Sequence, residues 1–283
     1  MPSPRLNNIL KDWRLWPNIC QSQPSHNELI PLNEGLTNEN WLLKPDGSTN
    51  TYVIRCNAEN QSSFYINRQH ERSIHQSVSE TGLCPAVIYE NPEKQYWIRP
   101  YITGNTLASL ESIDSFLQPC IKTLKSIHQL PIDNQWPTLK LSTRINLYWS
   151  QLSKKNPTNN HAFNQLNKII EQNFDIHSKY RPALCHMDCN LHNWIANKDK
   201  VFLIDWEYAH LGKPAWDLAI FCNSAKLNLE QIKQVLNIYG AVTYEELLQA
   251  SLEMQYLETL WYAIKLDQTY DELAIKLHAL FNL

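Results

Sequence analysis

Several features that would place this sequence in other classes of protein are missing from it. It has no apolar run of about 18 residues, so no membrane-spanning helix is predicted. Its N-terminus lacks a charged start followed by an apolar stretch, so no signal peptide is predicted. The net charge is −3 and no basic block or stripe occurs, so binding to nucleic acid or to an anionic membrane is not favoured.

Paired cysteines and frequent glycines are also missing. The seven cysteines are scattered, odd in number and without a C-x-x-C pair. This pattern predicts free thiols in a reducing cytoplasm and excludes a disulfide framework. Only six glycines occur in 283 residues, so each one marks a position where the backbone conformation matters.

What is present is an ordinary globular composition, with 43% hydrophobic and 19% charged residues. A chain of 283 residues can bury a large core, either in one large domain or in two lobes. We therefore expect a cytoplasmic globular protein that is a monomer or a homodimer.

The first third of the chain reads as a small antiparallel sheet with one helix. Apolar strands are expected over 29–32, 41–43, 52–55, 86–89 and 96–101, and Asp46-Gly47 between two of them predicts a hairpin. Ile66, Ile74 and Val78 recur at helical spacing, so a helix is expected over 62–80, capped by a serine at 62 or 63 and closed by a turn at Gly82.

The rest of the chain reads as mainly helical after a break at Gly104. Helices are expected over 114–130, with a kink or restart at Pro119, over 144–152 and 163–173, and from Asn228 to the end. Short strands are expected over 183–184, 194–196 and 201–204. The predicted fold class is α+β, with a β-rich nucleotide-binding lobe over 1–103 and a helical catalytic and acceptor-binding lobe over 104–283.

Two short motifs near residue 190 indicate the chemistry. His186-Met187-Asp188 leads to Asn193 in the pattern H-x-D-x-x-x-x-N, and the apolar run 201–204 ends in Asp205. Phosphoryl transfer from ATP needs one carboxylate facing the acceptor hydroxyl, and an amide and a second carboxylate to hold magnesium on the phosphates. Asp188 is therefore the predicted catalytic base, and Asn193 and Asp205 are the predicted Mg²⁺ ligands.

Other residues of these segments have structural roles or suggest a different site. His186 is expected to hydrogen-bond to neighbouring backbone and to shape the loop. A zinc site is disfavoured because the four soft ligands lie too close in sequence to surround one ion; they are Cys185, His186, Cys189 and His192. Asp217 is expected to cap a helix and to brace the catalytic loop.

Residues that would hold the nucleotide are predicted in the β-rich part. Arg55 on a strand and Glu71 on the following helix resemble the charge pair that kinase-type folds present to the α- and β-phosphates, with Glu59 as an alternative partner. The turn Gly35-Leu36-Thr37-Asn38 could cover the phosphates through its backbone N–H groups, although a plain hairpin turn remains open. The segment containing Arg99 and Tyr101 could pair with adenine as the chain crosses between the lobes.

Aromatic residues near the motifs indicate the acceptor. Aromatic faces bind ammonium groups by cation–π attraction, and a nearby carboxylate adds a counter-charge. The candidates for acceptor binding are Trp206, Glu207, Tyr208, Trp216 and Trp261, with core packing as the plainer explanation for any one aromatic residue.

These motifs resemble the family of choline kinases, bacterial thiamine kinases and aminoglycoside phosphotransferases over about residues 32–221. The segment Leu203-Ile-Asp-Trp-Glu-Tyr-Ala209 is most similar to the choline and thiamine kinase branch. The resemblance implies a two-lobed, protein-kinase-like fold that uses ATP and Mg²⁺, with Asp188 as the base. One departure is His192, where the family usually has glycine or another small residue.

We therefore expect an ATP-dependent kinase that phosphorylates a small cationic alcohol such as choline or thiamine. Phosphorylation of an aminoglycoside is an alternative, which would need a carboxylate-rich pocket. The acidic residues of the last part of the chain have helical spacings that favour solvated faces: Glu245, Glu246, Glu253, Glu258, Asp267, Asp271 and Glu272. A nucleotide-binding protein without turnover is a further alternative, and a protein kinase is disfavoured because Asp-Phe-Gly and Ala-Pro-Glu are missing.

Overall fold

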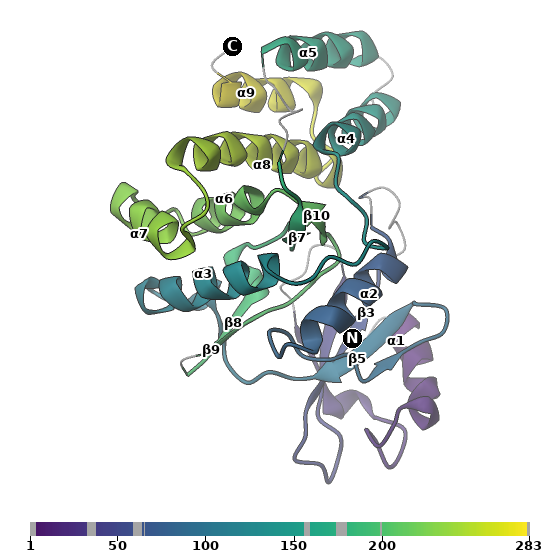
Figure 1. Cartoon of the computed structure of the whole chain (residues 1–283). Helices are drawn as coiled ribbons and strands as arrows, with labels where there is room; N and C mark the ends of the chain where they lie inside the picture. The colour runs from purple at the N-terminus through teal and green to yellow at the C-terminus, as the bar shows by residue number, and fades with distance from the viewer. Residues whose placement is uncertain are drawn as a thin grey trace.

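The computed structural model describes residues 4–32, 38–58, 64, 66–155, 159–173, 180–198 and 200–281. Its fold is α+β, with a β-sheet lobe and a larger helical lobe, as the sequence predicts (Figure 1). The two lobes lie one above the other in the view of Figure 1, with the sheet at the lower end and the C-terminal helices at the upper end.

A five-stranded antiparallel sheet, in the order β1-β2-β3-β5-β4, forms the smaller lobe. Its strands are β1 (Leu29–Leu32), β2 (Glu39–Leu43), β3 (Tyr52–Cys56), β4 (Tyr89–Glu90) and β5 (Tyr96–Pro100). The predicted hairpin is confirmed, because β2 pairs with β3 and Gly47 in their connection has a φ of 72°. The strand predicted over 86–89 is shorter and begins only at Tyr89.

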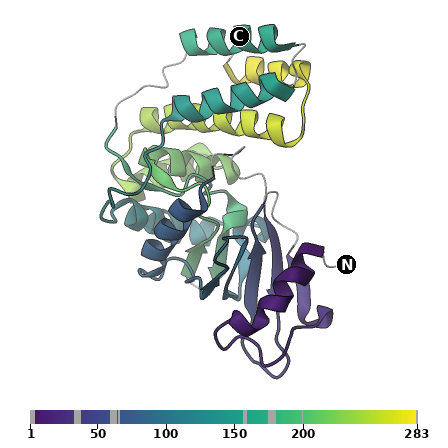
Figure 2. The same ribbon diagram turned by 90° about the vertical axis from the view of Figure 1, so that its right-hand side faces the viewer.

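The N-terminal segment covers one face of this sheet. Helix α1 (Pro4–Ile9) and the 3-10 helix η1 (Leu10–Leu15) bring apolar side chains onto β3 and β5, where they form a second core with Ile54 and Ile98. The indole N–H of Trp16 donates to the Tyr96 hydroxyl at 3.0 Å. Figure 2 shows these helices lying against the strands.

Helix α2 (Arg68–Ser79) begins later than the sequence predicts. Asn67 is its N-cap and accepts hydrogen bonds from two backbone N–H groups, while residues 62 and 63 lie outside the described part of the chain. The turn at Gly82 is confirmed, with a φ of 77°. The buried stripe of α2 starts with two charged residues, Arg68 and Glu71, before it continues with Ile74 and Val78.

The larger lobe is built from seven helices among the described residues, and α8 packs against both α6 and α4. They are α3 (Asp114–His128), α4 (Leu141–Lys155), α5 (Asn160–Asn173), α6 (Pro214–Ser224), α7 (Leu229–Tyr239), α8 (Tyr244–Lys265) and α9 (Tyr270–Phe281). A kink or a restart is predicted at Pro119, and the restart is wrong: α3 continues through the proline, and Leu117, Cys120 and Ile121 beside it are buried in the core.

Short strands carry the motif segments. β7 (Ala183–Cys185) pairs with β10 (His210–Gly212), and β6 (Asn105–Thr106), β8 (Trp194–Asn197) and β9 (Lys200–Leu203) form a three-stranded sheet. Gly104 lies just before β6 with a φ of 154°, and a Cβ there would lie 2.2 Å from the carbonyl oxygen of Ala196. Only glycine fits this close approach of the interlobe segment to β8.

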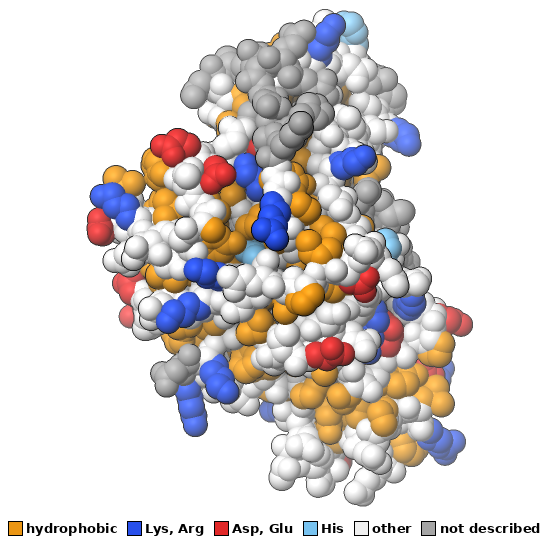
Figure 3. All heavy atoms as spheres, viewed as in Figure 1, with side chains coloured by type: hydrophobic (Ala, Val, Ile, Leu, Met, Phe, Trp, Pro, Cys, Tyr) orange, Lys and Arg blue, Asp and Glu red, His pale blue; other side chains and the backbone are white. Residues whose placement is uncertain are grey.

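No helix in the described ranges is both long and apolar enough to cross a membrane. On the face shown in Figure 3, lysine and arginine side chains are spread among acidic and uncharged ones rather than gathered in one stripe.

Candidate active site

The loop after β7 holds Asp188 through an unusual backbone conformation. Met187 has a φ of 64°, a left-handed conformation that few residues other than glycine adopt. The carboxylate of Asp217 accepts hydrogen bonds from the backbone N–H of His186 at 2.7 Å and of Met187 at 2.8 Å. Asp217 therefore braces this loop as predicted, but it does not cap α6, because it lies inside the first turn of that helix.

His186 orients the same loop. Its Nδ1 accepts from the backbone N–H of Asp188 at 3.2 Å, and its Nε2 lies 2.9 Å from the carbonyl oxygen of Ile204, to which it donates. Burial lowers the pKa of His186, so the ring is neutral and each nitrogen has one defined role. The structural role predicted for His186 is confirmed, and the ring ties the Asp188 loop to the residue before Asp205.

Asp188 and Asn193 are in direct contact. The Asn193 amide nitrogen donates to the backbone oxygen of Asp188 at 2.9 Å and to its carboxylate at 2.7 Å, and Asn190 donates to the other carboxylate oxygen at 2.7 Å. Burial and the neighbouring carboxylate of Asp205 raise the pKa of Asp188 well above its ordinary value, an effect that the two amides partly offset. A carboxylate with a raised proton affinity suits a group that must accept a proton.

Asp205 follows β9 and has a left-handed backbone, with a φ of 67°. The backbone N–H of Ile204 donates to the Asn193 carbonyl oxygen at 2.9 Å, so the pairing of β8 with β9 brings the two predicted metal ligands to the same end of the hairpin. The three residues of the motif therefore converge, and they offer carboxylate and amide oxygens to one region.

Arg55 on β3 reaches from the smaller lobe to this region. Its NH1 lies 2.8 Å from the Asp205 carboxylate and its NH2 donates to Glu71 on α2, while the guanidinium carbon stacks 4.5 Å from the centre of the Trp97 ring. Burial would lower the pKa of Arg55, but the carboxylates around it outweigh burial and raise it. The predicted pairing of Arg55 with Glu71 is present.

Glu71 also binds a second arginine, Arg68, which no pattern in the sequence singles out. One carboxylate oxygen faces Arg55 and the other lies 2.7 Å from Arg68 NH1, which also lies 2.8 Å from the Glu207 carboxylate. Burial would raise the pKa of Glu71, but the two arginines lower it. The signal in the sequence was an arginine three residues before a glutamate near a helix start, which is a common surface pair and so is not specific.

The other residues predicted to bind the nucleotide either lie outside the described part of the chain or are bonded within the protein. Gly35, Leu36 and Thr37 lie outside the described residues, as does Glu59. The Tyr101 backbone N–H is already bonded to the Thr51 carbonyl oxygen at 2.9 Å, so it is not free to pair with a base.

Arg99 lies on the same face of the sheet as Arg55, because in the β3–β5 register it is opposite Val53 while Trp97 is opposite Arg55. Burial and the nearby charge of Arg55 lower its pKa to about 10.

Two predicted acceptor-binding tryptophans are core residues. The Trp206 side chain is fully buried, stacks edge-on against His186 and donates its indole N–H to Leu203. Trp216 is also buried and donates its indole N–H to Glu253. Neither ring presents a face to a ligand in this structure, because the core of the larger lobe covers both.

Tyr208 and Trp261 are in contact with each other. The Trp261 indole N–H donates to the Tyr208 hydroxyl at 3.1 Å, and Trp261 packs edge-on against Tyr262 with ring centres 5.1 Å apart. Burial raises the pKa of Tyr208 and of Tyr262, and the charge of Asp188 adds to the rise in both. We call Tyr208, Trp261 and Tyr262 the aromatic cluster.

The acidic residues of the last helices differ from one another. Glu253 is buried and accepts from Trp216 and Gln249, so the prediction of a solvated face is wrong for this residue. The others are exposed: Glu245, Glu246, Glu258, Asp267, Asp271 and Glu272.

One buried group of possible metal ligands, His128, Cys185 and Asp217, lies beside the catalytic loop. His128 bonds to Asp217 at 3.1 Å through Nε2 and to the Tyr239 hydroxyl at 2.8 Å through Nδ1, and burial raises the pKa of the Cys185 thiol. The Asp217 oxygens already accept hydrogen bonds from three donors. The group is therefore a hydrogen-bonded brace, and its thiol remains protonated.

Comparison with known proteins gives consistent results. Residues 28–249 match the model of a family described as the phosphotransferase enzyme family. A LicA homologue from Metamycoplasma hominis is 28% identical over 216 residues, which cover 75% of this chain and 79% of the relative.

Among solved structures, the choline kinase LicA from Streptococcus pneumoniae superposes with a TM-score of 0.73 at 20% identity, covering 98% of this chain and 97% of that one. A ternary complex of streptomycin and ATP with APH(2")-IIa superposes with a TM-score of 0.67 at 17% identity, covering 100% and 97% of the two chains.

Proposed function

This chain belongs to the phosphotransferase enzyme family, and we propose that it transfers the γ-phosphoryl group of ATP to the hydroxyl of a small cationic alcohol of the choline type. The observation that carries the proposal is the convergence of Asp188, Asn193 and Asp205 beside Arg55. The choline kinase activity named for the LicA structure supports the choice of acceptor class, and the bound ATP named for the APH(2")-IIa complex supports the choice of donor.

In this mechanism Asp188 accepts a hydrogen bond from the acceptor hydroxyl and orients its oxygen toward the γ-phosphorus. A new oxygen–phosphorus bond forms, the bond from phosphorus to the β,γ-bridging oxygen breaks, and the hydroxyl proton passes to Asp188. Arg55 holds the phosphates by charge-assisted hydrogen bonds, and Glu71 fixes its direction.

The donor set fits magnesium. Asn193 and Asp205 supply hard oxygen ligands, and the Asn193 amide nitrogen is engaged by Asp188, so the amide oxygen is directed away from the base. When bound, the ion would offset the charge of the β- and γ-phosphates.

The direct test is phosphoryl transfer by the purified protein with ATP and magnesium, using choline, ethanolamine, thiamine and kanamycin as separate acceptors. We expect ADP release that depends on choline, a phosphorylated choline in the mass spectrum, and loss of turnover when EDTA is added. Turnover with kanamycin but with no amino alcohol would replace the proposal by aminoglycoside phosphorylation. ADP release with no acceptor at all would contradict both.

The aromatic cluster is the proposed contact for the ammonium group. Replacing Trp261 by leucine should raise the KM for choline about tenfold with little change in the KM for ATP, since a cation–π contact contributes about 0.5–2 kcal/mol. Trp261→Phe keeps an aromatic face and loses the bond to Tyr208, so it is the matched control and should stay nearer to the wild type. Equal effects of the two variants would show that the ring face does not bind the cation.

A further inference from the structure

Two arginines connect the lobes side by side, and both are anchored on Glu71. Arg55 joins Glu71 to Asp205, and Arg68 joins Glu71 to Glu207. The two bridges differ in access to solvent. The Asp205 side chain is 27% exposed, whereas that of Glu207 is 1% exposed. A ligand can therefore reach the first bridge, while the second is sealed within the protein.

The sealed bridge includes a third side chain, Asn38, which stands directly before β2. Its amide nitrogen donates to the Glu207 carboxylate at 2.7 Å, and its amide oxygen accepts from Arg68 NH2 at 3.0 Å and from the backbone N–H of Ala58 at 3.1 Å. Asn38 is 5% exposed. Its amide nitrogen and its amide oxygen are thus both engaged by protein groups, and its buried side chain faces the protein interior.

We propose that Arg68, Asn38 and Glu207 form a positioning node that fixes the start of β2 to the segment following Asp205. The inference rests on the proposed function, because it concerns how ATP is held. Asn38 stands directly before β2, which pairs with β3 so that Asn40 is opposite Arg55, and Glu207 lies two residues after Asp205. The node therefore sets the separation between the strand pair that carries Arg55 and the segment that carries Asp205.

The same geometry opposes the role first expected for Glu207, a counter-charge to the acceptor. Both of its described contacts are to protein groups, Asn38 and Arg68, and one of its oxygens receives both. Moving this carboxylate to a ligand would leave Arg68 with only part of its pairing.

The test exchanges the amide and the carboxylate. Asn38→Asp places two carboxylates in contact, and Glu207→Gln removes the charge facing Arg68. The double variant N38D/E207Q restores a donor opposite a carboxylate, keeps a carboxylate beside Arg68 and leaves the net charge unchanged. Ala58 N–H still finds an acceptor at position 38 in every variant.

The primary readout is the Mg-ATP concentration that gives half of the maximal rise in unfolding temperature, which does not depend on any acceptor. We expect N38D to weaken Mg-ATP binding about tenfold or more, because it adds a repulsive charge pair, and the double variant to return to within about threefold of the wild type. With choline as acceptor, the KM for ATP should rise in the single variants while the KM for choline stays unchanged.

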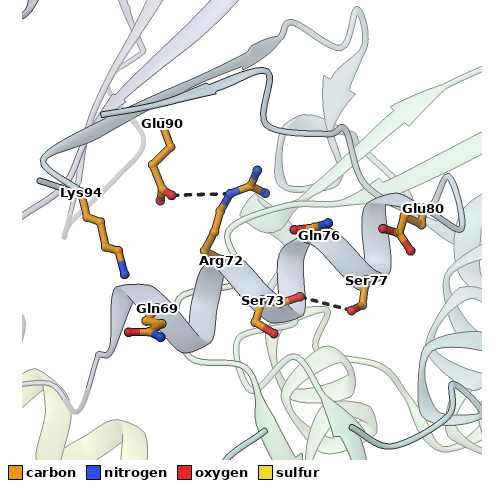
Figure 4. Close-up of a pocket in the computed structure, with 8 residues that line it drawn as sticks. All are labelled: Gln69, Arg72, Ser73, Gln76, Ser77, Glu80, Glu90 and Lys94. Carbon is orange, nitrogen blue, oxygen red and sulfur yellow. Dashed lines mark hydrogen bonds and ion pairs between the residues drawn. The ribbon is translucent and has the colours of Figure 1, made fainter. Parts of the chain in front are cut away.

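A control on the same helix is Arg72→Gln. Arg72 lies one turn of α2 after Arg68, but its side chain is 31% exposed. It pairs with Glu90 at 3.6 Å and lines a polar surface groove of about 380 Å³ with Lys94 and residues of α2 (Figure 4). Losing this outer pair should leave Mg-ATP binding at the wild-type level. An equal loss in Arg72→Gln would indicate general damage to α2 and would contradict a specific node.

Other results would also overturn the proposal. Losses in N38D and E207Q that simply multiply in the double variant would show that the two side chains do not act together. A rise in the KM for choline alone in E207Q would return Glu207 to the acceptor site. If N38D does not fold, the double variant is the test: weak Mg-ATP binding by a folded N38D/E207Q contradicts the node.

A wild type that binds Mg-ATP but phosphorylates no alcohol would refute the proposed function without contradicting the node.

Discussion

Replacing Asp188 by alanine should reduce kcat by about 10³-fold while Mg-ATP binding stays within a few-fold of the wild type, since general-base catalysis contributes about 10²–10⁴. The reason is that Asp188 is the acidic group held between Asn190 and Asn193 at the point where the motif residues converge. The measurement is steady-state turnover with choline, together with the ATP-dependent rise in unfolding temperature.

Asp133→Ala serves as the control for this prediction, because Asp133 is an exposed loop carboxylate bonded only to nearby backbone in the described contacts. It should leave kcat at the wild-type level. Near-normal turnover by Asp188→Ala would show that another group takes the proton or that no base is needed, and the proposed role of Asp188 would have to be abandoned.

Replacing Asp217 by asparagine should lower the free energy of unfolding by about 3 kcal/mol or more and also reduce turnover, although Asp217 is not expected to touch a substrate. Its carboxylate is fully buried and accepts from the backbone N–H groups of His186 and Met187 and from His128 Nε2. An amide would turn an N–H toward at least one of these donors. The left-handed backbone at Met187 would then lose its support, and Asp188 would move.

Urea denaturation of the wild type and Asp217→Asn measures the difference, with exposed Asp271→Asn in the first turn of α9 as the control. Burial would raise the pKa of Asp217, but the His128 hydrogen bond and the backbone donors lower it below the ordinary value of 3.8. The stabilisation by the ionised Asp217 carboxylate is therefore complete above pH 3.8 and is lost as the pH falls through the lower pKa of the folded state. The free energies of unfolding of the wild type and Asp217→Asn should therefore converge in acid. A difference in the free energy of unfolding that does not narrow below pH 3.8 would contradict the role assigned to the Asp217 charge.

The parts of the site that sequence reasoning could locate depend on short-range geometry. Asp188, Asn193 and Asp205 come together because one loop and one hairpin, β8–β9, lie between them, and the spacing of the motif already fixes that arrangement. Arg55 and Glu71 could be paired for a similar reason, since a strand and the next helix of a small sheet lobe lie close together.

The parts that could not be located depend on contacts between distant segments. Asn38, Arg68 and Glu207 meet across 169 residues of sequence, and no local pattern distinguishes them from a turn residue, a surface arginine and an acceptor-binding carboxylate. The start of α2 differs from the prediction for a related reason. Two serines, Ser62 and Ser63, precede the helix, and only the folded chain shows that Asn67 supplies the cap.

The tryptophans considered for acceptor binding could not be told apart from core residues by their sequence alone. Trp206, Trp216 and Trp261 look alike in sequence, yet the first two fill the core of the helical lobe and only the third belongs to the aromatic cluster. Trp216 is buried where α6 packs on α8, and Trp206 is buried against His186 of the catalytic loop, and the residues around each tryptophan in the sequence reveal neither contact.

The close approach of Gly104 to Ala196 also limits how the molecule can move. Strand β6, which begins at the next residue, is hydrogen-bonded to β8 and so travels with the catalytic hairpin. Strand β5 ends at Pro100 and is bonded into the five-stranded sheet. Tyr101 is still tied to this lobe by its bond to Thr51, so any rotation between the two sheets must be absorbed by the few backbone torsions between Tyr101 and Gly104.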